Sequence, residues 1–301
     1  MFSGNFPPSA ARFDAILLTA AGRRGIVSAP CSTISNGFSN TEMAELLGTV
    51  RRALRVLDYL ADAEEPVPIK RLAAELGLNI SSAYHVVNTL VVDGFVARDE
   101  RSGAYGVGAK AARLGDAYGR AWPVEPELRA IVGALGARTG ENAYLAMLHG
   151  KDVVITDIVE SRQRVRVHAL HRGYSGDLHA RALGKAVLAH RDAGSVRAHF
   201  SKHPPRRITP RTLVTMTAIE SELDRVRRRG YGEDLEEFCE GVCCVGAAFF
   251  AGDGSPAGSV SVSVPSFRYR AVRSAVRDAV LDAARAATGA LDTANRRVSL
   301  G

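Results

Sequence analysis

Three short segments with helical periodicity constrain the fold of this chain most strongly. Apolar side chains recur in them at spacings of three and four residues, over 42–63, 68–76 and 79–92. Gly77 ends the second segment, and Asn79 or Ser81 can cap the third, so only a short turn separates these two helices. Because helices of this length are marginal on their own, we expect the three apolar faces to meet in one core.

A two-stranded hairpin is predicted next, with strands at 95–97 and 104–107 on either side of the turn sequence RSG. Helix, helix, turn, helix and hairpin is the order of a winged helix-turn-helix, whose third helix enters a groove of DNA. The polar face of this helix offers hydrogen-bonding groups for base edges, from Asn79, Ser81, Ser82, Tyr84, His85 and Asn88. Phosphate contacts are expected from basic side chains outside that face, Lys70, Arg71, Arg98 and Arg101. A small helical domain that binds protein would show the same order of elements.

The charge of the chain does not decide between these alternatives. The net charge is +7, a value that invites a nucleic-acid interpretation. Residues 41–120, however, carry ten Lys and Arg against eleven Asp and Glu, and the positive excess lies mostly in 121–301. A sensor module that binds a small molecule without specific DNA binding is therefore the alternative function.

The remaining patterns suggest domain boundaries. Residues 1–40 have loop composition and are expected to form a disordered extension, and Met43 is an alternative start of translation. The winged helix-turn-helix covers 41–108, and a linker helix covers 109–122 and ends before Pro123. Mixed strands and helices over 123–301 predict an α+β domain like those of ligand sensors. The elements expected there are strands at 142–148, 153–159, 165–170, 242–250 and 259–264, and helices at 128–140, 183–190, 219–229 and 269–294.

The composition is that of a globular protein, with 46% hydrophobic and 24% charged residues. No apolar run reaches the roughly 18 residues that a membrane span needs, so we expect no membrane partner. Four cysteines, three of them within 239–244, do not form a disulfide framework, which favours a reduced, cytoplasmic protein. We expect no cofactor and no metal, because no cysteine pair has zinc-ligand spacing and neighbouring Cys243 and Cys244 would point to opposite faces of a strand.

An enzyme would need an activated nucleophile. Cys244 or Ser261 is a candidate, with His168, His171 or His179 as the base. The sequence contains no nucleophile elbow, phosphate-loop glycine pattern or metalloprotease motif. The chain is therefore predicted not to be an enzyme and to have no catalytic residues.

Two regions of the sequence resemble the isocitrate-lyase-regulator (IclR) family of transcriptional regulators. The stretch GLNISSAYHVVNTL at 77–90 is similar to the helix-turn-helix of that family. The order and spacing of its effector-binding domain are matched by LHARALGKA at 178–186, RGYGEDLEE at 229–237, EGVCCVGA at 240–247 and the strand at 259–265. The resemblance covers about residues 46–290. It implies an activator or repressor with a GAF-like ligand domain, which binds a double-stranded DNA operator as a homodimer or homotetramer.

The resemblance also implies an effector pocket. Its positions in this chain are Ala182, Leu183, Asp234, Cys244, Ser261 and Ser263. The two serines lie two apart on a strand, so both hydroxyls face one side, and the helix start near Ala182 would offer N–H groups to an anion. The expected effector belongs to the organic or aromatic acid class, most simply a carboxylate, with Asp234 as a hydrogen-bond or gating partner.

The sequence departs from the family pattern in three places. Arg181 stands where the family usually has a small residue or Thr, and it either pairs with an acidic ligand or points to solvent. His85 replaces a common Arg in the third helix, which leaves the phosphate contact at that position open. The proline often found in the family near 246–249 is absent.

Overall fold

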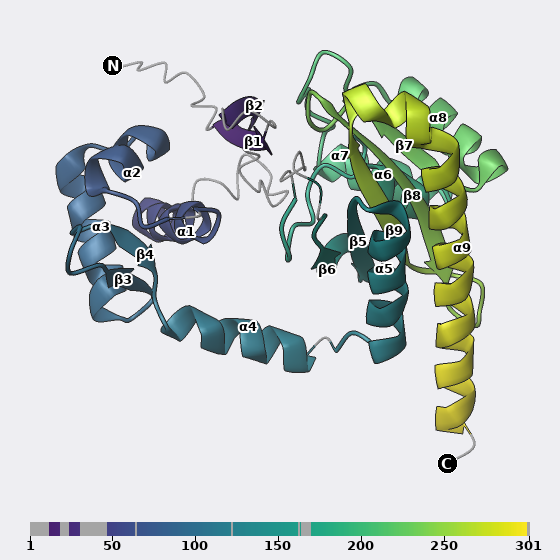
Figure 1. Ribbon diagram of the computed structural model, residues 1–301, viewed down its shortest axis with the longest axis horizontal. Coiled ribbons are helices and arrows are strands. Elements are labelled where there is room, and N and C mark those ends of the chain that lie inside the picture. The colour runs from purple at the N-terminus through teal and green to yellow at the C-terminus, as the bar shows by residue number, and fades with distance from the viewer. Residues whose placement is uncertain are drawn as a thin grey trace. The chain divides into compact units, whose positions relative to one another are not determined.

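The computed structural model describes residues 12–18, 24–30, 47–63, 65–121, 123–161, 163 and 170–299. The chain divides into two compact units (Figure 1). The first unit ends at Pro123, and the second starts at Val124 and also includes residues 12–18 and 24–30. Within residues 1–40, where the sequence predicts disorder, the structure has an antiparallel pair of strands, β1 (Arg12–Leu18) and β2 (Arg24–Pro30), and the other residues there lie outside the described ranges. No helix in the described ranges is both long and apolar enough to cross a membrane.

The first unit has the predicted order of elements. These are α1 (Gly48–Ala61), α2 (Ile69–Leu76), α3 (Ile80–Val92), β3 (Val96–Arg98), β4 (Tyr105–Val107) and α4 (Lys110–Ala121). Gly77 ends α2 with a φ of 64°, a left-handed conformation that glycine adopts without strain. Asn79 then caps α3, because its Oδ1 accepts the backbone N–H of Ser82 at 2.7 Å. The turn between the two helices therefore follows from local sequence.

The apolar faces of the three helices meet in one core, as the sequence predicts. Its buried members include Val56, Leu60, Leu72, Leu76, Ala83, Val86, Val87 and Leu90. The strands β3 and β4 pair antiparallel, with Val96 opposite Val107, and Val67 forms a further bridge with Tyr105. The hairpin is thus attached to the helical core as a wing, and the winged helix-turn-helix is confirmed.

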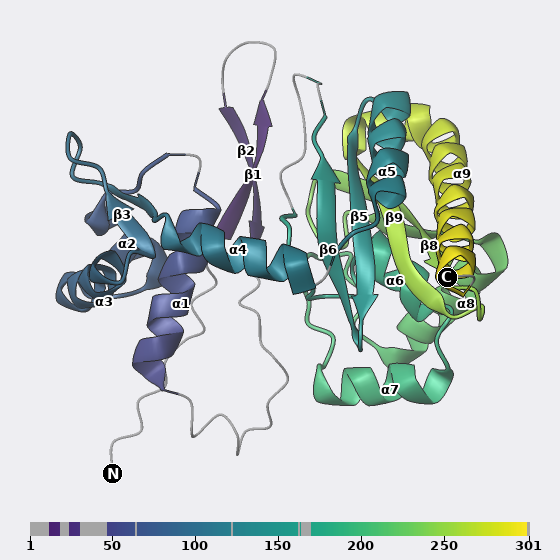
Figure 2. The ribbon, with the colours of Figure 1, turned by 90° about the horizontal axis from the view of Figure 1, so that it is seen from below.

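The second unit is built on a five-stranded antiparallel sheet with the order β6-β5-β9-β8-β7 (Figure 2). Its elements are α5 (Pro126–Thr139), β5 (Asn142–His149), β6 (Asp152–Val159), α6 (Ala182–Leu188), α7 (Ala193–Lys202), α8 (Met216–Arg229), β7 (Gly232–Leu235), β8 (Val242–Phe250), β9 (Pro256–Pro265) and α9 (Ser266–Ser299). The sequence did not predict α7 and β7. The strand expected at 165–170 falls almost entirely outside the described residues.

The two faces of this sheet are covered by different helices. Val245 and Val262 pack in one cluster with apolar residues of α5 and α9. Figure 2 shows these two helices on the same side of the sheet. On the other face, Cys244 packs in the cluster that also contains the apolar residues of α6 and α8. Because both faces are covered, every second residue of β9 can be a buried serine, and Ser259, Ser261 and Ser263 are all at most 2% exposed.

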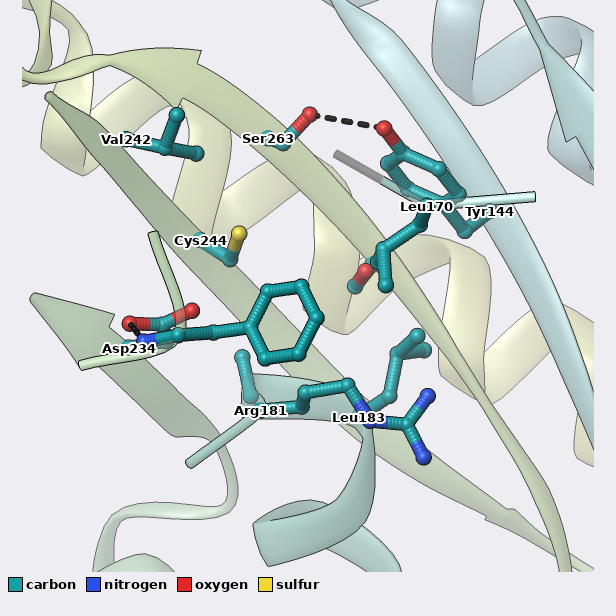
Figure 3. Close-up of a pocket in the computed structure, with 11 residues that line it drawn as sticks. Tyr144, Leu170, Arg181, Leu183, Asp234, Val242, Cys244 and Ser263 are labelled. Carbon is teal, nitrogen blue, oxygen red and sulfur yellow. Dashed lines mark hydrogen bonds between the residues drawn. The ribbon is translucent and has the colours of Figure 1, made fainter. Parts of the chain in front are cut away.

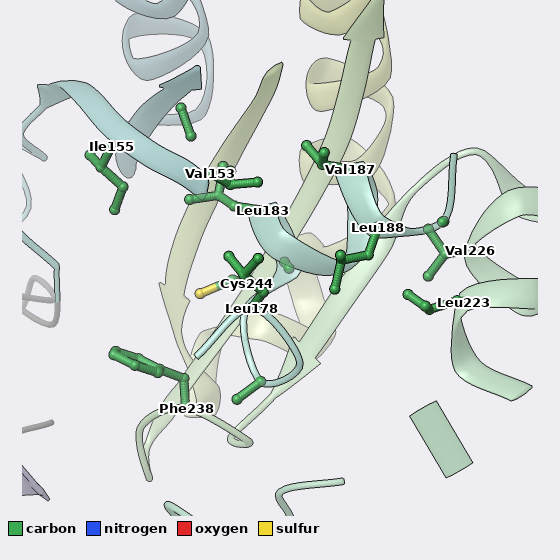
Figure 4. Packing of buried hydrophobic residues seen from close by; sticks show 14 of the residues in the cluster. Val153, Ile155, Leu178, Leu183, Val187, Leu188, Leu223, Val226, Phe238 and Cys244 are labelled. Carbon is green, nitrogen blue, oxygen red and sulfur yellow. The ribbon is translucent and has the colours of Figure 1, made fainter. Parts of the chain in front are cut away.

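Two glycines allow α6 to lie directly on the sheet. A Cβ at Gly246 would come within 3.0 Å of the backbone of Ala182, and a Cβ at Gly232 would come within 2.8 Å of its carbonyl oxygen. Leu183 and Val187 of the same helix are buried in the surrounding apolar cluster (Figure 4). The start of α6 is therefore held against β7 and β8.

Candidate functional site

The polar face of α3 is open to solvent. Its core face consists of Ala83, Val86, Val87 and Leu90, as the sequence predicts. Of the six residues predicted to contact bases, Ser82 is half-buried and the other five are exposed. Asn79 uses its side-chain oxygen for the helix cap, so it has a structural role as well. An exposed polar helix face of this kind can enter the major groove.

The basic residues predicted to contact phosphates are also exposed, and they are Lys70, Arg71, Arg98 and Arg101. Two of them belong to the wing. Its turn is held by Asp99, which accepts the backbone N–H of Ser102 at 2.7 Å and the hydroxyl of Ser102 at 2.6 Å. These hydrogen bonds lower the pKa of the Asp99 carboxyl. The turn therefore has a defined geometry in which Arg101 is presented to solvent.

A buried pocket lies between the start of α6 and the sheet (Figure 3). All seven residues expected at the ligand pocket line it, namely Arg181, Ala182, Leu183, Asp234, Cys244, Ser261 and Ser263. The other lining residues, which the sequence reasoning missed, are Tyr144, Leu170, Phe238 and Val242. The sequence predicts a strand around Tyr144, but no signal in it showed that this side chain faces the pocket.

Hydroxyl groups line one end of the pocket. The hydroxyl oxygens of Tyr144 and Ser263 are 3.0 Å apart, and the side-chain amide of Asn142 donates to Tyr144 at 3.3 Å. Burial raises the pKa of Tyr144 to about 12, so this hydroxyl keeps its proton at neutral pH. The hydroxyl groups of Tyr144 and Ser263 each carry one proton, and the hydrogen bond between them uses one of these two protons. The second proton has no acceptor in the described part of the chain, so it can be donated into the pocket.

Asp234 lies at the end of β7 and is 1% exposed. Its Oδ1 accepts the backbone N–H of Glu237 at 2.7 Å and that of Phe238 at 3.2 Å, which fixes the loop that carries the Phe238 ring. Burial raises the pKa of Asp234 to about 7, although Lys185 acts in the opposite direction. Asp234 therefore orients one wall of the pocket, and its hydrogen-bond or gating role toward a ligand stays a prediction.

Arg181 is also buried, with 1% of its surface exposed, so the alternative in which it points to solvent is wrong. Its guanidinium carbon lies 4.8 Å from the centre of the Tyr174 ring, and Nη2 lies 3.5 Å from the carbonyl oxygen of Val153. Burial lowers the pKa of this guanidinium. An arginine guanidinium stays protonated in proteins, so the group still carries its charge.

The pocket is nearly closed. The space open to the centre of a water molecule is about 10 Å³, which is the room that one water needs. A ligand with several heavy atoms therefore requires a lining side chain to move. Because α6 has only seven residues, the side chains that line the pocket, and not the dipole of that helix, determine its ligand chemistry.

The described residues do not assemble a catalytic or metal centre. Burial raises the pKa of the Cys244 thiol well above its usual value, which leaves it protonated and weakly nucleophilic. His179 contacts a backbone carbonyl at 2.9 Å, His171 is exposed, and neither lines the pocket, while His168 lies outside the described residues. No group of three or more His, Cys, Asp or Glu in the described ranges is placed to hold a metal ion.

Comparisons with known proteins identify the family. The family model "IclR helix-turn-helix domain" matches residues 49–100, and "Bacterial transcriptional regulator IclR C-terminal" matches residues 121–289. The HTH-type transcriptional regulator BhcR of Paracoccus denitrificans is 33% identical over 246 residues, which cover 80% of this chain and 88% of that protein. The glycerol operon regulatory protein of Streptomyces coelicolor is 30% identical over 225 residues, 73% of this chain and 86% of that protein.

A solved structure shows the same relationship. The crystal structure of the Thermotoga maritima IclR matches with a TM-score of 0.63 at 26% sequence identity, and covers 81% of this chain and 98% of that one. The chain therefore belongs to the IclR family of transcriptional regulators, and it is a DNA-binding regulator of transcription rather than an enzyme.

Proposed function

We propose that this regulator reads a DNA operator with α3 and the wing, and that a small organic acid bound in the pocket changes operator binding. One observation carries the effector part of this proposal. Residues from separate parts of the chain, at 181–183, 234, 244 and 261–263, converge on a single buried pocket. Because the regulator works on DNA, we also propose that it acts in the cytoplasm.

On the DNA side, we assign base contacts to the exposed polar side chains of α3, above all Tyr84 and Asn88. Arg98 and Arg101 of the wing and Lys70 and Arg71 of α2 would bind phosphates, which position the protein without reading sequence. His85 is exposed between these groups and stands where the family commonly has an arginine. Sequence reading would therefore rest on hydrogen bonds rather than on an arginine in this helix.

On the effector side, we favour a small aliphatic acid over an aromatic one. The pocket combines a buried guanidinium, hydroxyl donors and apolar walls, a mixture that suits a carboxylate on a short carbon skeleton. The pocket has a space of only about 10 Å³, so a small aliphatic acid requires less movement of the lining side chains than an aromatic acid does. Ser261 and Ser263 would hydrogen-bond the acid from β9, and Asp234 would hold the wall opposite them.

We propose a second copy of this chain as the partner of an exposed apolar face in the first unit. Leu47, Val50 and Leu54 follow one face of α1 and its start, and they are 73%, 52% and 57% exposed. The helix α4 buries none of its residues and exposes Leu114 and Tyr118. A two-fold dimer would cover these side chains and match an operator with two half-sites. Sedimentation velocity separates dimer from tetramer, and a monomer at micromolar concentration would contradict this assignment.

Fluorescence anisotropy with DNA from upstream of the protein's own gene tests the functional proposal. A thermal-shift screen of small carboxylates first selects the acid used as the probe. Ser261→Ala combined with Ser263→Ala is expected to weaken the response to that acid by about tenfold or more, the loss of one or two good hydrogen bonds. Operator affinity without the acid should stay the same, because these residues lie outside the DNA-binding unit.

Two controls make this experiment decisive. Ser201→Ala changes an exposed serine of α7 and should leave both the operator affinity and the acid response unchanged. Asn88→Ala should weaken operator binding while leaving acid binding intact. A normal acid response in the double serine variant would show that the pocket assignment is wrong.

A further inference from the structure

Arg181 is a buried cation whose hydrogen-bond donors are mostly unused. It is 1% exposed, and its Nε and Nη1 atoms have no hydrogen-bond partner in the described part of the chain. The remaining nitrogen, Nη2, has only the carbonyl oxygen of Val153 at the long distance of 3.5 Å. Burying a guanidinium with so few hydrogen-bond partners is unfavourable. A negatively charged acceptor beside this group would therefore stabilise it.

The carboxylates that act electrostatically on Arg181 are hydrogen-bonded to other groups. Asp177 accepts Nε and Nη2 of Arg206 at 2.8 and 2.7 Å, and the hydroxyl of Tyr174 at 2.7 Å. Asp234 accepts two backbone N–H groups. The hydroxyl bond to Asp177 also fixes the Tyr174 ring, whose face lies against the guanidinium. Arg181 is thus held in place by a ring and has no bonded counter-ion among the described residues.

Below about pH 7, the positive and negative charges of the groups around the pocket do not sum to zero. Lys185 pairs with Glu237 at 2.6 Å, and Arg206 pairs with Asp177 at 2.7 Å. Burial raises the pKa of Asp234 to about 7, so its carboxyl is mostly protonated below that pH. One positive charge, that of Arg181, is left over, and a single carboxylate would neutralise it.

The opposite end of the pocket offers hydrogen bonds but no charge. In Figure 3, the Tyr144–Ser263 hydroxyl pair lies at the far end from Arg181, with Leu170 between the two ends. Arg181 is the only Lys or Arg among the described residues that line the pocket. The free hydroxyl proton at the Tyr144–Ser263 end therefore suits an uncharged oxygen better than a second carboxylate.

We propose that Arg181 is a specificity-determining residue that binds the single carboxylate of the effector, while Tyr144 and Ser263 bind an uncharged oxygen further along the same molecule. The effector is then an oxo- or hydroxy-carboxylate, and neither a simple aliphatic acid nor a dicarboxylate. This inference rests on the proposed function, because it assigns the ligand chemistry of the same pocket.

Calorimetric titration of the full-length protein with matched acids tests this inference. Pyruvate, acetoacetate, levulinate and 5-oxohexanoate place the carbonyl at increasing distances from the carboxylate. The oxo acid that binds most tightly is then compared with the straight-chain acid of the same length, with its own amide, and with the dicarboxylate. We expect the oxo acid to bind about tenfold tighter than each of the three, the effect of one well-placed polar contact.

Variants assign the two contacts separately. Arg181→Gln is expected to remove the preference for the acid over its amide and to keep the preference for the oxo acid over the straight-chain acid. Tyr144→Phe combined with Ser263→Ala is expected to do the reverse. Arg181→Lys keeps the charge and should retain the acid preference, which provides a readout if the glutamine variant does not fold. Arg138→Gln removes an arginine that is 55% exposed in the same unit and serves as the control.

The outcomes distinguish this inference from the proposed function. An unchanged ratio of acid to amide affinity in Arg181→Gln would overturn the role of Arg181, and tightest binding of the dicarboxylate would overturn the uncharged second contact. In both cases the proposed function still holds if Ser261→Ala with Ser263→Ala weakens acid binding. If no acid binds the wild-type protein, the effector class and this inference are both wrong.

Discussion

Replacing Asp234 by Asn tests whether the carboxyl group of Asp234 is protonated in the folded protein. The carboxyl group is 1% exposed, and burial raises its pKa from 3.8 to about 7. Asparagine has nearly the same shape and keeps an oxygen that can accept the backbone N–H groups of Glu237 and Phe238. The substitution therefore removes the ionisation and preserves the loop that it holds.

The sign of the effect follows from the protonation of the two states. Below pH 3.8 the carboxyl is protonated in the folded and the unfolded chain alike. Between about pH 4 and pH 7 the unfolded chain loses this proton while the folded protein keeps it, so the stability of the wild type falls as the pH rises. Above about pH 7 both states are ionised and the loss is complete. A difference of about three pKa units corresponds to ~4 kcal/mol, an upper value because local relaxation reduces it.

Urea unfolding of the wild type and of Asp234→Asn between pH 4 and pH 8 measures this difference. The stability of the variant minus that of the wild type should be near zero at pH 4, increase up to about pH 7, and then stay constant. Asp253→Asn is the matched control, because that carboxyl is exposed and hydrogen bonds with Ser255 lower its pKa. A difference that does not change with pH would refute the conclusion that Asp234 is protonated in the folded protein.

Three further predictions concern other parts of the molecule. Asn79→Ala removes the cap of α3 and should lower the free energy of unfolding by about 1 kcal/mol, measured by urea denaturation. Arg101→Gln should weaken binding to specific and non-specific DNA alike, and should reduce the slope of log affinity against log salt by about 1 in titrations at several salt concentrations. Gly246→Ala places a Cβ 3.0 Å from the backbone of Ala182, so it should displace α6 and weaken acid binding in calorimetry, whereas Gly133→Ala, with nothing within 4 Å, should not.

The DNA-binding unit was predictable because its signals are local. A glycine after one apolar segment and a capping asparagine before the next determine the turn between α2 and α3 within a few residues. The spacing of apolar residues then identifies the buried face of α3 without reference to any other element. Of the elements that the sequence analysis missed, α7 does have a capping residue, because Asp192 accepts the backbone N–H of Ser195, but the helix buries only Val196 and Phe200. The strand β7 has only four residues and joins the sheet through its pairing with β8.

The pocket was predictable only in part, because its chemistry depends on contacts between distant segments. The family resemblance supplied positions such as Ser261 and Asp234, but it carried no information about residues that the family motif does not include. Tyr144 lies opposite Ser261 in the register of β5 and β9, and only this pairing brings the phenol to the pocket. The burial of Arg181 depends on the Tyr174 ring, so no local pattern distinguishes it from an exposed arginine.

The helix α4 is part of the covalent connection between the two units. Contacts within one chain do little to stabilise this helix. None of its residues is buried, and a helix of 12 residues is marginal in water on its own. In the proposed dimer, contacts through Leu114 and Tyr118 would supply much of its stability. Allosteric coupling typically amounts to about 1–3 kcal/mol, which is comparable to burying one or two such side chains. If the proposed dimer forms, an acid that changes how its two copies of α4 meet would shift operator binding without any rearrangement of the five-stranded sheet.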